Sequence, residues 1–167
     1  MTILVSDTSV IIDLERSQLL DACFRLPHEF AVPDLLYHRE LAEFGGAALV
    51  NLGLRVEELT PDELTAVQAV RRVRPKLSLP DSYAYALASG RQWTLLTGDA
   101  ELRAVAQAEA IPFFGVLWVT DQLFEGKAIE AATVAEGLEA LAAHPRCRLP
   151  RAEVQARITR YRKGHAE

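Results

Sequence analysis

Short apolar segments alternate with longer helical patterns along this chain, and this alternation restricts the possible folds more than any other feature of the sequence. The first segment, residues 3–6, is apolar up to its last residue, Ser6, as strands are when a parallel sheet is covered on both faces. Further strand-like segments lie at 30–32, 54–59, 94–97 and 113–119. Strands that alternate with helices predict an α/β fold with a mostly parallel central sheet.

The expected helices begin and end at recognisable residues. Thr60 is an expected N-cap, with Pro61 at the first helical position and Glu63 completing a capping box. A helix over about 35–44 is expected to stop at the glycine pair that follows it. Other helices are expected to begin after Asp7 and to cover about 80–88, 100–110, 121–125, 131–143 and 151–161.

The cysteine content and the length of the apolar runs indicate the cellular compartment of such a chain. The only two cysteines, Cys23 and Cys147, lie far apart, which excludes a disulfide scaffold and a cysteine zinc site. They fit a reducing compartment, so we expect a cytoplasmic protein. The N-terminus lacks the pattern of a signal peptide. The longest apolar run, 113–119, is far shorter than the roughly 20 residues that span a bilayer, so no membrane partner is expected.

Charge is distributed unevenly. The net charge is −5, yet residues 144–167 carry seven of the 18 Lys and Arg side chains and only two acids. We expect a domain over 1–130 and a helical extension with a basic tail over 131–167. The tail is expected to bind RNA or an acidic partner, or to be a solvated chain end. The remaining, acidic body repels nucleic acid, so a nucleic-acid function would require metal ions or a local basic strip.

Four carboxylates lie where a parallel sheet would gather them. Asp7 directly follows the first strand, and Asp99 follows the 94–97 strand after one glycine. Ligands in such folds bind beyond the carboxyl ends of the strands. Asp81 lies in the first turn of a helix, where the helix dipole favours a negative charge. Glu40 shares an expected helix face with Leu36 and Phe44, and a carboxylate on an apolar face requires a partner.

A cluster of these acids would require compensation, because close carboxylates raise one another's pKa. No Lys or Arg lies within the four motifs, whereas Mg²⁺ or Mn²⁺ would suit an all-oxygen site. Such an ion would support the hydrolysis of a phosphodiester by water.

Each acid also has a purely structural interpretation. Asp7 would cap the helix after it, and Asp81 would be an ordinary first-turn acid. Asp99 would belong to a turn, and Glu40 would reach solvent at the edge of its helix. Taken singly, these interpretations are favoured; taken together, the four positions favour a functional cluster.

Several segments resemble one known family. They are 5–12 (Val-Ser-Asp-Thr-Ser-Val-Ile-Ile), the helix that carries Glu40, 79–88 (Leu-Pro-Asp-Ser-Tyr-Ala-Tyr-Ala-Leu-Ala) and 95–102 (Leu-Leu-Thr-Gly-Asp-Ala-Glu-Leu). In order and spacing, over about residues 3–120, the chain resembles the PIN-domain nucleases. In size it resembles the VapC-type toxins of prokaryotic toxin–antitoxin pairs.

The resemblance implies a Rossmann-like, three-layer α/β/α fold and a site that holds Mg²⁺ or Mn²⁺. Carried over to this chain, the catalytic and metal-binding acids would be Asp7, Glu40, Asp81 and Asp99. Supporting roles would fall to Thr8, Ser9, Thr97 and Glu101. The family further implies an RNA substrate, an antitoxin protein as partner and a homodimer.

The chain departs from the common toxin pattern at two places. Trp118 stands in a region where many such toxins have a small, glycine-containing turn, and the chain continues well past their usual end. These departures leave the acids in place and concern only the toxin subtype.

A basic strip precedes the Asp81 helix and consists of Arg71, Arg72, Arg74 and Lys76. It would hold RNA phosphates near the acids, because phosphate contacts position a substrate without reading its sequence. The alternative is a solvated helix end whose cations favour the helix dipole.

The leading hypothesis is a metal-dependent endoribonuclease, the toxin of a type II toxin–antitoxin pair. The alternative is a catalytically silent PIN-like module that binds RNA or protein. A phospho-acceptor receiver domain ranks below both, because residues 113–119 lack the lysine that such a domain needs after a late strand.

Overall fold

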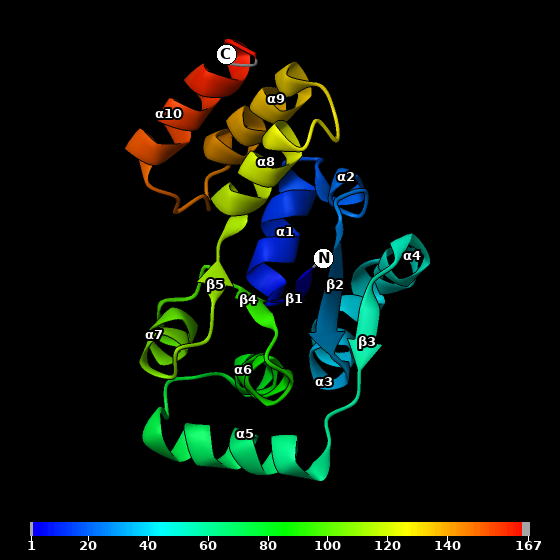
Figure 1. The fold of residues 1–167 in the computed structure, drawn as a ribbon, viewed down its shortest axis with the longest axis vertical. Helices are drawn as coiled ribbons and strands as arrows, with labels where there is room; N and C mark the ends of the chain where they lie inside the picture. The colour runs from blue at the N-terminus through cyan, green and yellow to red at the C-terminus, as the bar shows by residue number, and fades with distance from the viewer. Residues whose placement is uncertain (1, 165–167) are drawn as a thin grey trace. The chain divides into compact units, whose positions relative to one another are not determined.

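Five parallel strands form the sheet in the computed structural model, which describes residues 2–164. Within this range the strands are β1 (Thr2–Ser6), β2 (His28–Pro33), β3 (Arg55–Glu57), β4 (Thr94–Leu96) and β5 (Phe113–Phe114). Their order is β3-β2-β1-β4-β5, and every neighbouring pair is parallel (Figure 1). The predicted α/β class is confirmed as a three-layer α/β fold.

The strand order reverses direction at β1, which has β2 on one side and β4 on the other. A crevice forms at such a switch point, beyond the carboxyl ends of the strands. Ser6 of β1 pairs with Leu96 of β4, and the Asp7 amide donates to the Leu96 carbonyl at 2.9 Å. The residues that leave β1 and β4 therefore start side by side.

The chain divides into two compact units. Unit 1 comprises the residues up to Val10 together with Pro27–Gly115, and unit 2 comprises Ile11–Leu26 and the chain from Val116 onward. The boundary expected at residue 130 stays a prediction.

Unit 1 holds the sheet and most of the helices around it. These helices are α3 (Asp34–Leu36), η1 (Tyr37–Leu41), η2 (Ala42–Phe44), α4 (Gly46–Leu52), α5 (Pro61–Val73), α6 (Leu79–Arg91) and α7 (Ala100–Ala108). The core gathers around α6, where Ala84, Leu87 and Ala88 are fully buried. Alanines let this helix pack closely against β4 and α5. The predicted N-cap at Thr60 is confirmed, since its hydroxyl accepts from the Glu63 amide at 3.2 Å.

The helix expected over 35–44 changes type along its length. After α3 the chain forms a π-helical turn, η1, and then a 3-10 turn, η2, which ends at Gly45 with φ of +85°. The expected face of Leu36, Glu40 and Phe44 is therefore wrong: Leu36 is fully buried, but Phe44 is 75% exposed. A π turn holds more residues than an α turn and so shifts the side-chain phase. Leu41, which is 4% exposed, takes the inward position.

The strand expected over 113–119 is also shorter than predicted. β5 has two residues, and the apolar stretch from Val116 onward belongs to a helix, α8 (Val116–Glu125). A short apolar run cannot by itself distinguish a strand from a buried helix, and here the helical choice buries Val116, Leu117 and Val119.

All the regular elements in the described part of unit 2 are helices. The helix α1 (Thr8–Arg16) continues from unit 1 into it, and the others are α2 (Leu20–Cys23), α8, α9 (Ala131–Ala143) and α10 (Arg151–Arg162). The helices predicted at 131–143 and 151–161 are thus confirmed. None of the helices within residues 2–164 is long and apolar enough to cross a membrane.

Some arginines of the basic tail form ion pairs with acidic side chains of unit 2. Arg157 pairs with Asp121 at 3.0 Å, Arg160 with Glu125 at 2.8 Å, and Arg162 with Glu139 at 2.9 Å. The C-terminal part of unit 2 is therefore an ordered helix as far as Arg162. The last three residues of the predicted tail lie outside the described residues.

Candidate active site

Asp7 is held in place by the start of α1 and by the end of β4. Its side chain is 2% exposed, and one oxygen accepts from the Ser9 hydroxyl at 2.8 Å and from the Val10 amide at 2.9 Å. The other oxygen accepts from the Thr97 hydroxyl at 2.5 Å. Asp7 therefore caps α1, as its structural interpretation requires, and is also fixed to the end of β4.

Thr97 connects the acids that follow β1 and β4. Its hydroxyl donates to Asp7 and accepts from the Asp99 amide at 3.0 Å. Asp99 in turn caps α7, because its carboxylate accepts from the Leu102 amide at 2.9 Å. Each hydrogen bond leaves further lone pairs on the carboxylates, so capping does not exclude a second ligand.

Glu40 reaches the same place from another element. It lies in the π-helical turn η1, and its carboxylate accepts a hydrogen bond from the Thr8 hydroxyl. Thr8 directly follows Asp7, so this contact joins η1 to the end of β1. Single π turns within helices are frequent at functional sites.

Asp81 lies in the first turn of α6. Ser78 is the N-cap of that helix, and its hydroxyl accepts from the Asp81 amide at 3.1 Å. This cap sets where the helix begins and therefore where the Asp81 side chain lies.

The four acids interact electrostatically. Burial is the main reason that the pKa of Asp81 rises from 3.8 to about 6, and the charges of Asp7, Asp99 and Glu40 raise it further, against a lowering by Ser78. Burial also raises the pKa of Asp7, although hydrogen bonds from Thr97, Val10 and Ser9 oppose it. None of the four acids forms an ion pair with a Lys or Arg in the described part of the chain.

The donor chemistry of this cluster fits a hard divalent cation. Among residues 2–164, no three His, Cys, Asp or Glu side chains are placed to hold a metal ion together. Mg²⁺, however, commonly keeps several waters and is bound through only one or two carboxylates. Asp7, Glu40, Asp81 and Asp99 are therefore suitable donors for a partly hydrated ion.

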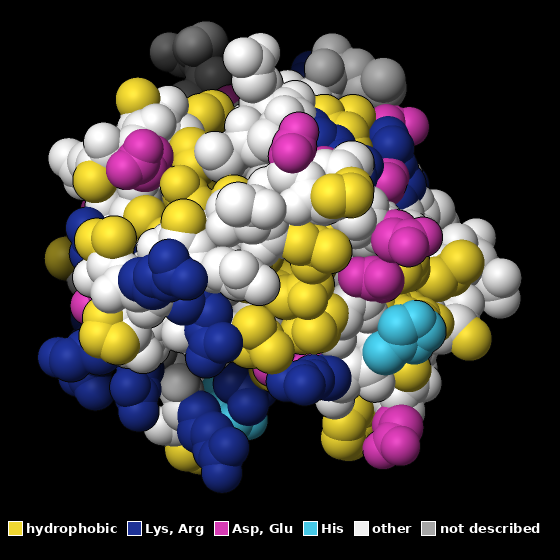
Figure 2. All heavy atoms as spheres, turned by 90° about the horizontal axis from the view of Figure 1, so that it is seen from below, with side chains coloured by type: hydrophobic (Ala, Val, Ile, Leu, Met, Phe, Trp, Pro, Cys, Tyr) yellow, Lys and Arg dark blue, Asp and Glu magenta, His cyan; other side chains and the backbone are white. Residues whose placement is uncertain are grey.

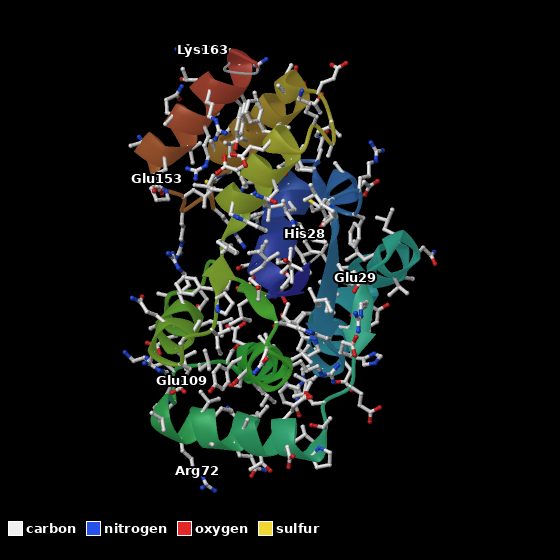
Figure 3. The ribbon with its side chains drawn as sticks, viewed as in Figure 1. His28, Glu29, Arg72, Glu109, Glu153 and Lys163 are labelled. Carbon is white, nitrogen blue, oxygen red and sulfur yellow. The ribbon has the colours of Figure 1, made fainter. Side chains whose placement is uncertain are left out.

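The other candidate residues lie on α7, on α5 and in the loop before α6. Glu101 lies in the first turn of α7, and its carboxylate is 3.8 Å from the Arg74 guanidinium. Arg71 and Arg72 are exposed in the last turn of α5, and Lys76 is exposed in the loop before α6. Figure 3 shows Arg72 pointing away from the outer side of α5. The structure thus brings Thr8, Ser9 and Thr97 to the acids, but it places Glu101 beside the basic strip.

Sequence reasoning missed two features of the site. The first is the N-cap Ser78, although a Ser three residues before Asp81 is a recognisable capping pattern. The π turn that carries Glu40 was not expected, and no local pattern predicts it. Its effect on the helix phase becomes visible only in the fold.

The chain matches one family profile over nearly its whole length. The family is described as a PIN domain, and the match covers residues 3–163. None of the curated proteins that were compared matches the sequence.

Proposed function

The chain belongs to the PIN-domain family, whose members are generally nucleases, and we propose that it is a metal-dependent endoribonuclease that hydrolyses RNA phosphodiester bonds. One observation carries the proposal: four carboxylates from separate elements interact electrostatically, and no Lys or Arg in the described part of the chain forms an ion pair with them. Such a group costs folding free energy unless a cation binds it. An active site is the usual reason for such an arrangement.

The site residues have two roles in this proposal: the acids bind the metal ion, and hydroxyl side chains orient the acids. Asp7, Glu40, Asp81 and Asp99 would hold Mg²⁺ or Mn²⁺, which supplies a polarised phosphoryl oxygen and a more acidic water. Thr97 orients Asp7 and the Asp99 backbone, and Thr8 orients Glu40. Ser9 adds a second hydroxyl donor to Asp7. These contacts would fix the carboxylates of Asp7 and Glu40 before substrate arrives, which preorganises this part of the site.

The basic strip supplies the RNA contacts in this proposal. Arg71, Arg72 and Lys76 are exposed, so they are free to meet phosphates from solvent. Arg74 is half-buried and touches Glu101, so we assign it a weaker role at the rim of the site. Phosphate contacts of this kind would position RNA without selecting its sequence.

The biological setting is proposed on the same basis. We propose a cytoplasmic toxin of a type II toxin–antitoxin pair that forms a homodimer and is inhibited by an antitoxin protein. The resemblance of the acidic motifs and the size of the chain to VapC-type toxins support this subtype.

A catalytically silent module that binds RNA or protein is the second candidate. One observation favours it: no three acidic, His or Cys side chains in residues 2–164 are placed to hold a metal ion together. It predicts binding that does not depend on the four acids.

Cleavage of a mixed RNA pool distinguishes the two candidates. We expect the wild type to cut with Mg²⁺ or Mn²⁺ and not with EDTA. Asp7→Asn and Asp99→Asn should each lose at least about a hundredfold in rate, as removal of a metal ligand or electrostatic stabiliser typically does. Glu109→Gln, an exposed acid at the end of α7, is the matched control and should cut normally. Circular dichroism checks that each variant is folded. Cleavage retained by either Asp variant, or an inactive wild type with both metals, would contradict the nuclease.

A further inference from the structure

Unit 2 contains a cavity of about 760 Å³ that is lined by the end of α9, the loop after it and the first part of α10. Its lining residues all fall within 142–158, so the cavity belongs to unit 2 alone. Sites for small molecules in proteins commonly have volumes of about 300–1,000 Å³. The cavity is therefore large enough for an organic ligand, and the chemistry of its lining indicates which kind.

One part of the lining is aliphatic. It consists of three alanines with Pro145, Leu149, Val154 and Ile158. Val154 and Ile158 are buried, so this part of the cavity reaches toward the core of unit 2. An aliphatic chain suits such a surface, because each buried methylene group is removed from water. No Phe, Tyr or Trp of the described chain lines the cavity, so it lacks a ring on which a nucleic-acid base could stack.

The polar part of the lining offers hydrogen-bond donors. The guanidinium of Arg151 can donate two parallel hydrogen bonds to one carboxylate, and Gln155 adds an amide one helical turn further along. His144 accepts from the Arg146 amide at 3.1 Å through Nδ1, so its neutral ring carries the proton on Nε2 and donates there. Among residues 2–164 no acid lines the cavity, since Glu153, at the start of α10 in Figure 3, lies outside the lining.

The arginines next to the cavity lack acidic partners, unlike those further along α10. The three arginines within 157–162 pair with acids of unit 2. Arg146, Arg148 and Arg151 form no ion pair within the part of the chain that the structure describes. Figure 2 shows a comparable separation at the surface, where Lys and Arg gather mainly apart from the acidic side chains. The cavity thus lies beside positive charge that no described side chain neutralises.

We propose that this cavity binds an organic anion, namely a carboxylate joined to an aliphatic chain. Arg151, Val154 and Ile158 follow one another at spacings of three and four residues, so they lie along one face of α10. The carboxylate would meet Arg151, and the chain would extend along the helix toward Ile158. An RNA strand fits less well, because the aliphatic part would remove its phosphates from water without a compensating partner. Binding here does not depend on the proposed nuclease, since the acid cluster takes no part in it.

Isothermal titration calorimetry on the full chain in metal-free buffer tests the proposal with three probes. Octanoate has both the carboxylate and the chain, octanamide has the chain without the charge, and acetate has the carboxylate without the chain. We expect octanoate to bind at least about tenfold tighter than either of the others, because it alone meets both parts of the lining. No binding of octanoate, or equal affinity for octanamide or for acetate, would overturn the proposal.

Substitution of Arg151 tests where the carboxylate binds. Because this side chain is exposed, Arg151→Gln should fold normally, and it should weaken octanoate at least about tenfold while changing octanamide little. Arg151→Lys keeps the charge and should keep the preference for octanoate over octanamide. Arg25→Gln is the matched control, since Arg25 is an exposed arginine of unit 2 outside the lining and should be dispensable for binding. Unchanged affinity for octanoate in Arg151→Gln would overturn the proposal.

Cys147 reports whether the ligand occupies this cavity. It is a half-buried lining residue with a free thiol, whereas Cys23 is fully buried and burial raises its thiol pKa to about 12. The uncharged reagent N-ethylmaleimide should therefore label Cys147 first, and Cys147→Ser should lose this labelling. At about ten times its Kd, octanoate should slow the labelling about tenfold, because only the unoccupied cavity reacts.

Two results of this labelling experiment would contradict the proposal. Octanoate that binds without protecting Cys147 would lie elsewhere on the chain. An unpaired RNA oligonucleotide that displaces octanoate and protects Cys147 would assign the cavity to RNA.

Discussion

The two ends of α6 differ in whether their charged side chains have partners of opposite charge. At the start of the helix, Asp81 interacts with other carboxylates, and no Lys or Arg among residues 2–164 forms an ion pair with them. At its end, Arg91 donates to Glu57 at 2.7 Å, to Glu63 at 3.0 Å and to the Glu58 carbonyl at 2.8 Å. The carboxylates at the start of α6 thus lack a cationic partner, whereas those at its end are paired with Arg91.

The compensated end is an ionic ladder, which we define as Glu29, Arg55, Glu57, Arg91 and Glu63. Arg55 connects Glu29 and Glu57 at 2.8 and 2.7 Å, so positive and negative charges alternate along it. The ladder joins β2, β3, α5 and α6, and Figure 3 shows Glu29 beside β3.

Two neighbouring residues complete the surroundings of the ladder. Trp93 has the guanidinium carbons of both arginines 5.1 Å from its ring centroid. Gly90 leaves room for Glu63, because a Cβ at this position would be 2.9 Å from the Glu63 Cγ. Packing around the ladder therefore depends on residues that carry no charge.

The comparison shows which carboxylates are stabilised by arginine side chains and which are not. Burial alone would raise the pKa of Glu57, but hydrogen bonds from Arg91 and Arg55 outweigh it and lower the pKa. At Asp81 the neighbouring charges act in the same direction as burial. The ladder therefore stabilises its own ions, whereas the charges of the acid cluster oppose one another.

Removing Arg91 from the ladder should have the largest effect on the free energy of unfolding. Arg91→Met leaves Glu63, whose side chain is 7% exposed, without its ion-pair partner, while Glu57 keeps its contact with Arg55. Because an unpaired carboxylate in such a place is costly, we expect a loss of about 3 kcal/mol in the free energy of unfolding, measured with urea. Adding Glu63→Gln to Arg91→Met should recover part of that loss.

The control for this variant is Arg72→Met on α5, which removes an exposed arginine without a described ion pair. Its free energy of unfolding should stay within about 0.5 kcal/mol of the wild type. A loss below about 1 kcal/mol for Arg91→Met would show that the ladder matters no more than an exposed pair.

The two ends should also respond to pH in opposite directions. The pKa of Asp81 is raised to about 6 from 3.8, so the folded state binds more protons than the unfolded chain between these values. Stability therefore falls as pH rises through this window. The pKa of Glu57 is lowered from 4.5, so its contribution is present above 4.5 and is lost as pH falls below that value.

Thermal melts in EDTA at several pH values check these signs. We expect the melting temperature of the wild type to fall between pH 5 and pH 7, and Mg²⁺ to reduce this fall because it binds the ionised carboxylates. Asp81→Asn should remove much of the fall, and Glu57→Gln should leave it unchanged. An unaltered slope in Asp81→Asn would mean that the acid cluster does not destabilise the free protein.

The acid cluster was easier to predict from the sequence than the ladder. Asp7 and Asp99 each follow a strand, and the carboxyl ends of adjacent parallel strands meet, so their approach follows from local patterns and topology. The α/β class and the cap at Thr60 follow from local patterns in the same way. The roles of the four acids stay a prediction until activity is measured.

The ladder could not be predicted, because its members come from distant parts of the chain and no spacing relates them. Arg55 and Glu57 look like ordinary polar positions of a short edge strand, and Arg91 looks like a favourable cation at a helix end. Their meeting depends on the register of β2 against β3 and on the packing of α5 against α6. The same holds for Phe44, whose exposure depends on the π turn before it.

Replacing Trp93 should give the smallest effect and shows what the ladder gains from its aromatic neighbour. Trp93→Leu keeps an apolar side chain but removes the ring that both guanidiniums approach. A cation–π contact at a partly exposed site contributes about 0.5–1 kcal/mol, so two of them give an expected loss of about 1–2 kcal/mol. In Arg91→Met the same replacement should cost about half as much, since one guanidinium remains. This coupling, measured as a double-mutant cycle in urea, separates the ring's interaction with Arg91 from its packing. An equal loss in both backgrounds would mean that Trp93 stabilises the unit by packing alone and that the ladder consists only of its ion pairs.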